Sequence, residues 1–250
     1  MDIDVNVIGI RTMLRTFTRK LLFNKRWIVV LLIAAFLAAV MGYAATLAED
    51  ELYDGSGLMS ALMLSFLLPI MALIYGASML RNDMDDRSIT TVISSPLDRR
   101  VTYLGYYLSL VIALTVMLLI VLFAGWLAYF LVAGMDGDAV GLLLSYSGLM
   151  VIGAIVYSSL FLAIGVLIRQ PIYLGLIYAF VWEGFVGSVP GAIGDYTIMR
   201  QIKVIGAEVV STGQITDLDG DVLISVVVLA VVTVVLFLAG AFAFREKEMP

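Results

Sequence analysis

The sequence predicts an all-α membrane protein with six transmembrane helices, and three observations support this fold class. Hydrophobic residues make up 62% of the 250 residues and charged residues only 14%, and the mean hydropathy of +1.05 is far above that of soluble domains. Six apolar runs follow one another, separated by short polar stretches. Most lysines and arginines lie in alternate connections between these runs, which is typical of multi-pass membrane proteins.

Each of the six apolar runs is expected to cross a bilayer core about 30 Å thick. The fifth run is the shortest, and the second contains Pro69, where we expect a kink. The even spread of the runs indicates one transmembrane domain over residues 1–250. The expected spans are residues 27–48, 58–80, 106–132, 140–168, 172–189 and 222–244.

The positive charges set the expected orientation of the chain. Of the 15 lysines and arginines, six precede the first span, four lie between the second and third spans, one lies between the fourth and fifth, and two follow the sixth. These connections therefore face the cytoplasm by the positive-inside rule. We expect both termini to be cytoplasmic, and we expect an acidic loop at residues 49–55 on the opposite side.

The segment before the first span, residues 2–26, is expected to form a basic amphipathic helix. A helix with apolar residues on one side and arginines on another lies in the headgroup plane of the membrane. A basic tail that only sets the orientation is the alternative. The apolar positions are Val7, Ile10, Leu14, Phe17 and Leu21, and the arginines that step by four are Arg11, Arg15 and Arg19.

A second amphipathic helix is expected at residues 82–96, between the second and third spans. Acidic residues at its start complement the positive end of a helix, apolar residues share one face, and a proline ends it. Such a helix lying along the membrane surface is suited to dock a cytoplasmic partner, and a plain basic loop is the alternative. The expected docking residues are Asp85, Asp86, Arg87, Ile89, Val92, Ile93, Pro96, Arg99 and Arg100.

A further helical element is expected on the external side, at residues 190–221, between the fifth and sixth spans. Ile198, Ile202, Ile205 and Val209 keep helical spacing. The acidic run that starts at Asp217 is not a calcium-binding loop, because its twelfth position is a valine and not a glutamate.

Glu183 is the only acidic or basic residue well inside an apolar run. An ionised residue at the centre of a membrane helix costs about 2.5–3.5 kcal/mol on insertion scales, so such residues are usually functional. Glu183 is therefore a candidate contact for a substrate or ion. The alternative is a structural brace: the adjacent Trp182 is an interfacial residue type, and Glu183 could pair with backbone donors of the external helix.

The residue types that are missing exclude several kinds of chemistry. The chain contains neither cysteine nor histidine, which excludes disulfides, thiolate metal sites, histidine zinc sites and Ser–His proteolysis. None of its four lysines follows a glycine, so it lacks the phosphate-binding loop of P-loop ATPases. We therefore expect a non-catalytic chain without cofactors, in which any ATP-driven work is done by another polypeptide.

Two sequence motifs and the arrangement of the spans resemble the permease subunits of ABC-2-type transporters. The stretch from Asp86-Arg87 to Ser95-Pro96 and Arg99-Arg100 is similar to the pattern between the second and third spans of that family. Tyr178 followed by Trp182-Glu183 is similar to the segment that precedes its external helices. Ser88-Ile89 departs from a common Gly-Thr, and Gly105-Tyr106 from a frequent Gly-Lys.

The resemblance implies a half-transporter in the plasma membrane of a prokaryote, more often an exporter. Two permease chains, identical or related, would form the pathway with two cytosolic ATPase subunits that bind ATP and magnesium. Residues 82–96 would be the coupling helix, beside the N-terminal helix, and no nucleic acid is expected as a partner. Two alternatives stay open: an ATP-independent secondary transporter, and a membrane anchor for a cytosolic complex.

Overall fold

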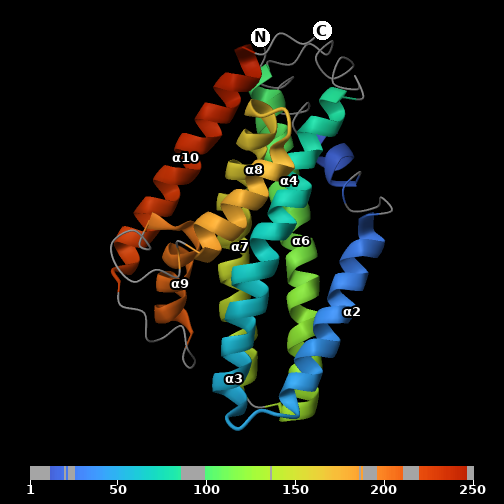
Figure 1. Ribbon diagram of the computed structural model, residues 1–250, viewed down its shortest axis with the longest axis vertical. Coiled ribbons are helices and arrows are strands. Elements are labelled where there is room, and N and C mark those ends of the chain that lie inside the picture. Colours follow the sequence, from blue (N-terminus) through green and yellow to red (C-terminus); the bar gives the residue numbers. More distant parts are fainter. Residues whose placement is uncertain are drawn as a thin grey trace.

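The described part of the protein is a bundle of helices that contains no strand (Figure 1). The computed structural model describes residues 12–19, 21, 26–85, 99–135, 137–185, 187, 196–210 and 220–246. Five helices within these ranges are long and apolar enough to cross a membrane, which agrees with the predicted all-α membrane class. They are α2 (Arg26–Ala45), the continuous helix from α3 to α4 (Glu51–Asp85), α6 (Arg99–Ala133), α7 (Gly137–Leu167) and α10 (Val222–Glu246).

The fifth apolar run forms a shorter helix in two parts, α8 (Pro171–Ile177) and η2 (Tyr178–Phe185). Its described helical part extends to Phe185, and the predicted end at residue 189 lies outside the described residues, as do residues 186 and 188–195. At 1.5 Å per residue, a helix of this length reaches only about 22 Å, less than a bilayer core of about 30 Å. That this fifth run also crosses the membrane, and so brings the number of spans to six, therefore stays a prediction.

The second apolar helix begins earlier than predicted, because the acidic residues start it instead of forming a loop. Asp50 is the N-cap, and its carboxylate accepts a hydrogen bond of 3.1 Å from the backbone N–H of Tyr53. Glu51 and Asp54 then lie in the first turn, where negative charge is favourable. The predicted acidic loop at residues 49–55 is therefore wrong from residue 51 onward, because acidic residues at a helix N-terminus stabilise the helix.

The same helix contains a π-helical segment, η1 (Met59–Leu67), just before Pro69. A proline within a helix has no N–H to donate and its ring clashes with the carbonyl one turn earlier. The wider hydrogen bonding of a π-helix accommodates this, as seen where the N–H of Leu68 donates to the carbonyl of Met63 five residues earlier. Pro69 is thus accompanied by a π-helical segment, a change in helical winding.

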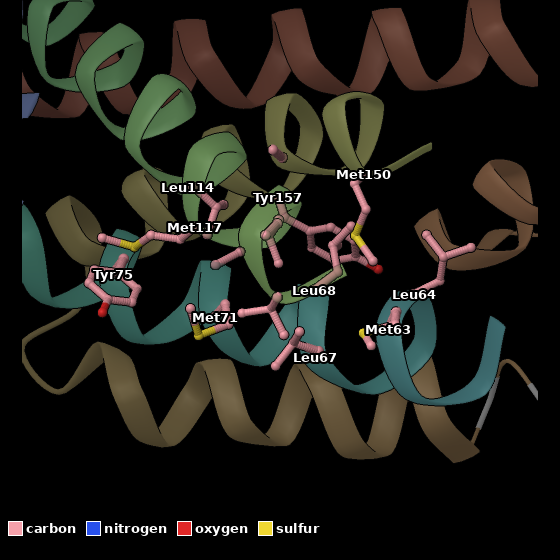
Figure 2. Packing of buried hydrophobic residues seen from close by; sticks show 14 of the residues in the cluster. Met63, Leu64, Leu67, Leu68, Met71, Tyr75, Leu114, Met117, Met150 and Tyr157 are labelled. Carbon is pink, nitrogen blue, oxygen red and sulfur yellow. The ribbon is translucent and has the colours of Figure 1, made fainter. Parts of the chain in front are cut away.

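The core lies where the second, third and fourth long helices meet (Figure 2). Aliphatic and methionine side chains fill it, with Leu68 and Met71 from α4, Met117 from α6 and Met150 from α7. Glycines allow α4 and α7 to approach closely: a Cβ on Gly165 would lie 3.0 Å from the backbone oxygen of Ala77. Small residues at such contacts are typical of helix packing in membranes.

The segment predicted as an external helical element contains α9 (Ile198–Val209), which packs against both α7 and α10 (Figure 1). Thr197 caps it by accepting a hydrogen bond of 3.3 Å from the N–H of Arg200. Ile202 and Ile205 are buried as their spacing predicts. Val209, which was grouped with them, is 54% exposed because it is the last residue of the helix and lies beyond that contact.

Candidate functional site

The fifth apolar helix is buried along one side only, and Glu183 lies at the end of that side. Every fourth residue from Pro171 is buried, namely Pro171, Gly175, Ala179 and Glu183. The absent side chain of Gly175 leaves room for Leu73 of α4 and Phe161 of α7. Residues four apart drift by about 40° round an α-helix, and the wider π-helical turns of η2 offset this drift in the opposite direction. Glu183 therefore stays on the buried side.

The carboxylate of Glu183 joins η2 to the start of α9. Its Oε1 accepts hydrogen bonds from the hydroxyl of Tyr178 at 2.7 Å and from the N–H of Ile198 at 3.2 Å. Its Oε2 accepts one from the N–H of Met199 at 3.0 Å. These N–H groups belong to the first turn of α9, where they have no partner within the helix and where negative charge is favourable.

Two further polar side chains lie near this carboxylate. Tyr157 of α7 is fully buried beside it, although its hydroxyl makes no hydrogen bond of good geometry within the described residues. Burial lowers the pKa of the Lys203 ammonium on α9, and the Glu183 carboxylate partly offsets that effect. With both carboxylate oxygens engaged and only 7% of the residue exposed, the geometry is that of a structural brace. It is not that of an open substrate contact.

Trp182 and Glu183 were predicted together, but the structure directs them to different sides of η2. Trp182 is 41% exposed, whereas Glu183 is buried against α9. A partially exposed tryptophan in a membrane helix is typical of the interfacial region.

The N-terminal helix, residues 12–19, packs against the first turns of α6. The rings of Phe17 and Tyr106 lie 4.4 Å apart, and a Cβ on Gly105 would lie 3.1 Å from the sulfur of Met13. Met13, and not the predicted Leu14, therefore shares the buried side with Phe17 and Leu21. The predicted face was one residue off at this turn because the space at Gly105 receives Met13. Gly105 and the spacing of residues 13, 17 and 21 were the available signals.

Of the three arginines predicted on this helix, the structure describes two. Arg15 and Arg19 are exposed on the side away from α6, and Arg11 lies outside the described residues. The apolar side contacts protein, so this helix is attached to the bundle and not only to the lipid surface.

Only the two ends of the predicted docking segment are described. α4 remains helical to Asp85, and Arg99 and Arg100 open α6. The predicted residues Asp86, Arg87, Ile89, Val92, Ile93 and Pro96 lie outside the described ranges.

Arg99 has an internal partner that its sequence position did not indicate. Its Nη1 donates a hydrogen bond of 2.8 Å to the backbone oxygen of Arg245, in the last turn of α10. Carbonyl groups at a helix C-terminus lack intrahelical partners and carry partial negative charge, so a guanidinium is a favourable donor. Arg99 thus connects the beginning of α6 to the end of α10.

The second and fifth helices share an exposed aromatic surface that sequence reasoning missed. Phe66 of η1 and Phe180 of η2 are each 52% exposed, and their ring centroids lie 6.5 Å apart in an edge-to-face arrangement. Ile74 and Ile177 are exposed on the same two helices. We call Phe66 and Phe180 the aromatic surface. No sequence signal distinguishes it from other lipid-facing residues.

Among the described residues, no group of three or more acidic side chains could hold a metal ion. The candidate sites are the Glu183 contact, the end of the bundle where α6 meets the N-terminal helix and the end of α10, and the aromatic surface. Comparison of the chain with models of known protein families finds no match, and comparison with curated proteins finds no relative.

Proposed function

We propose that this chain is the membrane-spanning subunit of an ABC-2-type transporter, an exporter that works with two separate cytosolic ATPase subunits. The observation that carries the proposal is the joining of helices at one end of the bundle. There, the N-terminal helix is fixed to α6 through Phe17 and Tyr106, and Arg99 fixes α6 to the end of α10. The proposed coupling helix, residues 82–96, begins within the last turn of α4, which ends at Asp85, and precedes the start of α6 at Arg99.

This arrangement is suited to carry a movement from the cytoplasmic side into the bundle. Displacement of residues 82–96 by an ATPase would pull on α4 and α6 together, since both helices continue from that segment. α6 is 35 residues long and unbroken, so it would move as a rigid element. The helix that contains α4 includes the π-helical segment η1, and such segments often occur at functional sites.

The pathway is proposed to lie along the aromatic surface, where a second permease chain would face the first. Phe66 comes from η1 and Phe180 from η2, so both members of the pair lie in π-helical segments. A change in the winding of either segment would alter the distance between the two rings. The brace formed by Glu183 would keep η2 attached to α9 during this movement.

The test of the proposal uses the predicted apolar face of the coupling helix. Replacing Ile89 and Val92 with aspartate should abolish co-purification of the two ATPase subunits while the chain still inserts into the membrane, because an apolar contact would be lost. The matched control is Tyr53→Asp, an exposed position in α3, which lies at the end of the bundle opposite the end of α10 (Figure 1), and this variant should not affect association.

The same preparation distinguishes the alternatives. Export by the reconstituted complex should require ATP hydrolysis and should not follow an ion gradient. Unchanged association of the ATPases with the Ile89 and Val92 variant would refute the coupling helix. Transport driven by an ion gradient in the absence of ATPases would favour a secondary transporter, and ATPase binding without any transport would favour a membrane anchor.

A further inference from the structure

An apolar groove of about 360 Å³ runs between α7, α9 and α10. Its floor is formed by Val156, Ile205 and Leu229, one from each helix, and these residues are between 2% and 6% exposed. Its walls include Val226 and Ala230 along the first half of α10. Figure 1 shows α9 between α7 and the beginning of α10. The groove therefore lies on the side of α10 that faces the bundle.

The groove offers no free hydrogen-bonding group within the described residues. The single hydroxyl in its lining belongs to Thr233, and it donates at 2.7 Å to the backbone oxygen of Leu229 within α10. The backbone oxygen of Ile155, on the α7 side, accepts a hydrogen bond of 3.2 Å from Tyr107. A lining of this kind selects an apolar chain by shape and by burial of apolar surface.

A second hollow adjoins the groove at Val226, which lines both. This hollow contains two exposed carboxylates, Glu208 near the end of α9 and Asp221 just before α10. Asp221 caps α10 by accepting a hydrogen bond of 2.9 Å at Oδ1 from the N–H of Leu223. No lysine or arginine contributes to the described lining of either hollow. The apolar groove thus opens onto a negatively charged rim.

We propose that this groove binds a single-chain amphiphile with a cationic head group. The alkyl chain would lie against Val156, Ile205 and Leu229, and the ammonium group would lie at the rim between Glu208 and Asp221. Opposite charges at the rim and a purely apolar groove below it match the two ends of such a molecule. A phospholipid fits less well, because its phosphate would face two carboxylates and its second chain would have no groove.

The site is shorter than the bilayer core is thick, so its occupant would enter from one side of the membrane. From Asp221 to Val234, the last lining residue on α10, a helix advances about 20 Å. This is about two-thirds of a bilayer core of about 30 Å. The proposal requires that α10 spans the membrane, but it does not depend on the transporter function, since binding alone is measured.

The test uses the purified chain in phosphatidylcholine nanodiscs and a hexadecyltrimethylammonium probe with a photoreactive diazirine on its chain. After irradiation, mass spectrometry should place the label on α7, α9 and α10 at the groove. Excess hexadecyltrimethylammonium should compete with the probe, whereas hexadecyl sulfate should not. Labelling spread evenly over the exposed side of α10, or equal competition by the two detergents, would overturn the proposal.

Two sets of variants separate the groove from the rim. Ala230→Phe fills the groove and should abolish site-specific labelling, whereas Val231→Phe, at the adjacent position that does not line the groove, should leave it unchanged. The double variant Glu208→Gln and Asp221→Asn removes both charges and keeps a capping oxygen at position 221. It should raise the half-saturating probe concentration about tenfold, since two exposed ion pairs are lost.

The rim double variant also provides a test that does not depend on correct folding of Ala230→Phe. For the wild-type chain, labelling should weaken as the salt concentration rises, because exposed charges are screened. For the rim double variant, labelling should be insensitive to salt. Equal probe affinity of the wild type and the rim double variant, or equal salt dependence, would show that the carboxylates do not recognise the head group and would refute the cationic ligand.

Discussion

α7 and α10 are both long apolar helices, but α7 is largely buried inside the bundle and α10 is largely exposed at its edge. In α7, 83% of the most apolar stretch is buried, against 11% in α10, although α10 is the more hydrophobic helix. The buried residues of α7 include glycines, serines and tyrosines, whereas α10 exposes a long series of valines. Lipid tails are as apolar as the protein interior, so hydrophobicity alone does not drive one of the two helices inward. Small and weakly polar residues mark the buried helix instead.

The contacts of the two helices differ accordingly. α7 meets α4 where Gly165 admits the backbone of Ala77 and where Gly153 leaves space for Leu68. α10 has only four buried residues, Ser225, Leu229, Gly240 and Phe244, all along one line. At Gly240 the ring of Tyr103 from α6 fills the space that a side chain would take. We therefore expect α7 to be sensitive to substitution at many positions and α10 at few.

The largest effect is expected from Gly165→Leu in α7. The new side chain would meet the backbone of α4, which cannot move aside as a flexible side chain can. Overpacking of this kind destabilises by about 1–3 kcal/mol and sometimes more, and contact with backbone places it at the upper end. Thermal unfolding in detergent, followed by loss of the monodisperse peak in size-exclusion chromatography, measures the change.

Ala239→Leu in α10 is the matched control, because Ala239 is exposed and the same atoms would enter the lipid or detergent. Its thermal stability should equal that of the wild type. Equal losses at positions 165 and 239 would break the comparison between the two helices.

The next largest effect is expected from Glu183→Ala, which tests whether a polar contact matters as much as packing around α7. The substitution leaves two N–H groups of α9 and the hydroxyl of Tyr178 without their acceptor. Losing a helix cap and leaving buried groups unpaired should lower the free energy of unfolding by about 2–3 kcal/mol. Limited proteolysis should then cut earlier around residues 196–209.

Two variants sharpen this result. Glu183→Gln keeps one acceptor oxygen, so it should lose only about 1 kcal/mol. Glu208→Ala removes an exposed carboxylate from the other end of α9 and should leave both stability and proteolysis unchanged. If Glu183→Ala stops transport without a change in stability, the brace is refuted and a direct contact with the transported substrate is favoured.

The sequence was sufficient to predict the helical membrane class and the approximate position of the five long helices, because apolar runs report insertion into a bilayer directly. The predicted bounds of α2, α7 and α10 lie within three residues of the observed helices, whereas the second long helix and α6 each begin seven residues earlier than predicted. It was also sufficient to raise the brace formed by Glu183 as one of two possibilities. Choosing between them required the distances to Ile198 and Met199, since pairing between separate helices leaves no local pattern.

Other features depended on contacts that spacing does not encode. The helix at residues 12–19 uses Met13 because Gly105, far along the chain, leaves room for it. The aromatic surface joins Phe66 and Phe180, which are ordinary lipid-facing residues when each helix is considered alone. The acidic start of the second helix was predicted as a loop, because charge density outweighed the capping signal of Asp50.

The smallest effect is expected from Arg99→Ala, which removes a single fixed point of α10. The guanidinium of Arg99 donates to the backbone oxygen of Arg245, and one partly exposed hydrogen bond from a charged donor contributes about 1 kcal/mol. Global stability should therefore change little, while hydrogen exchange in the last turn of α10 should become about fivefold faster. Arg245→Lys keeps both the backbone oxygen and the positive charge, so exchange there should match the wild type.

Because α10 is buried at only a few positions, the loss of one hydrogen bond should be detectable at its end. If exchange in that turn is as slow in Arg99→Ala as in the wild type, then packing at Gly240 and Phe244 alone holds this end of α10, and α10 is less loosely attached than its exposure indicates.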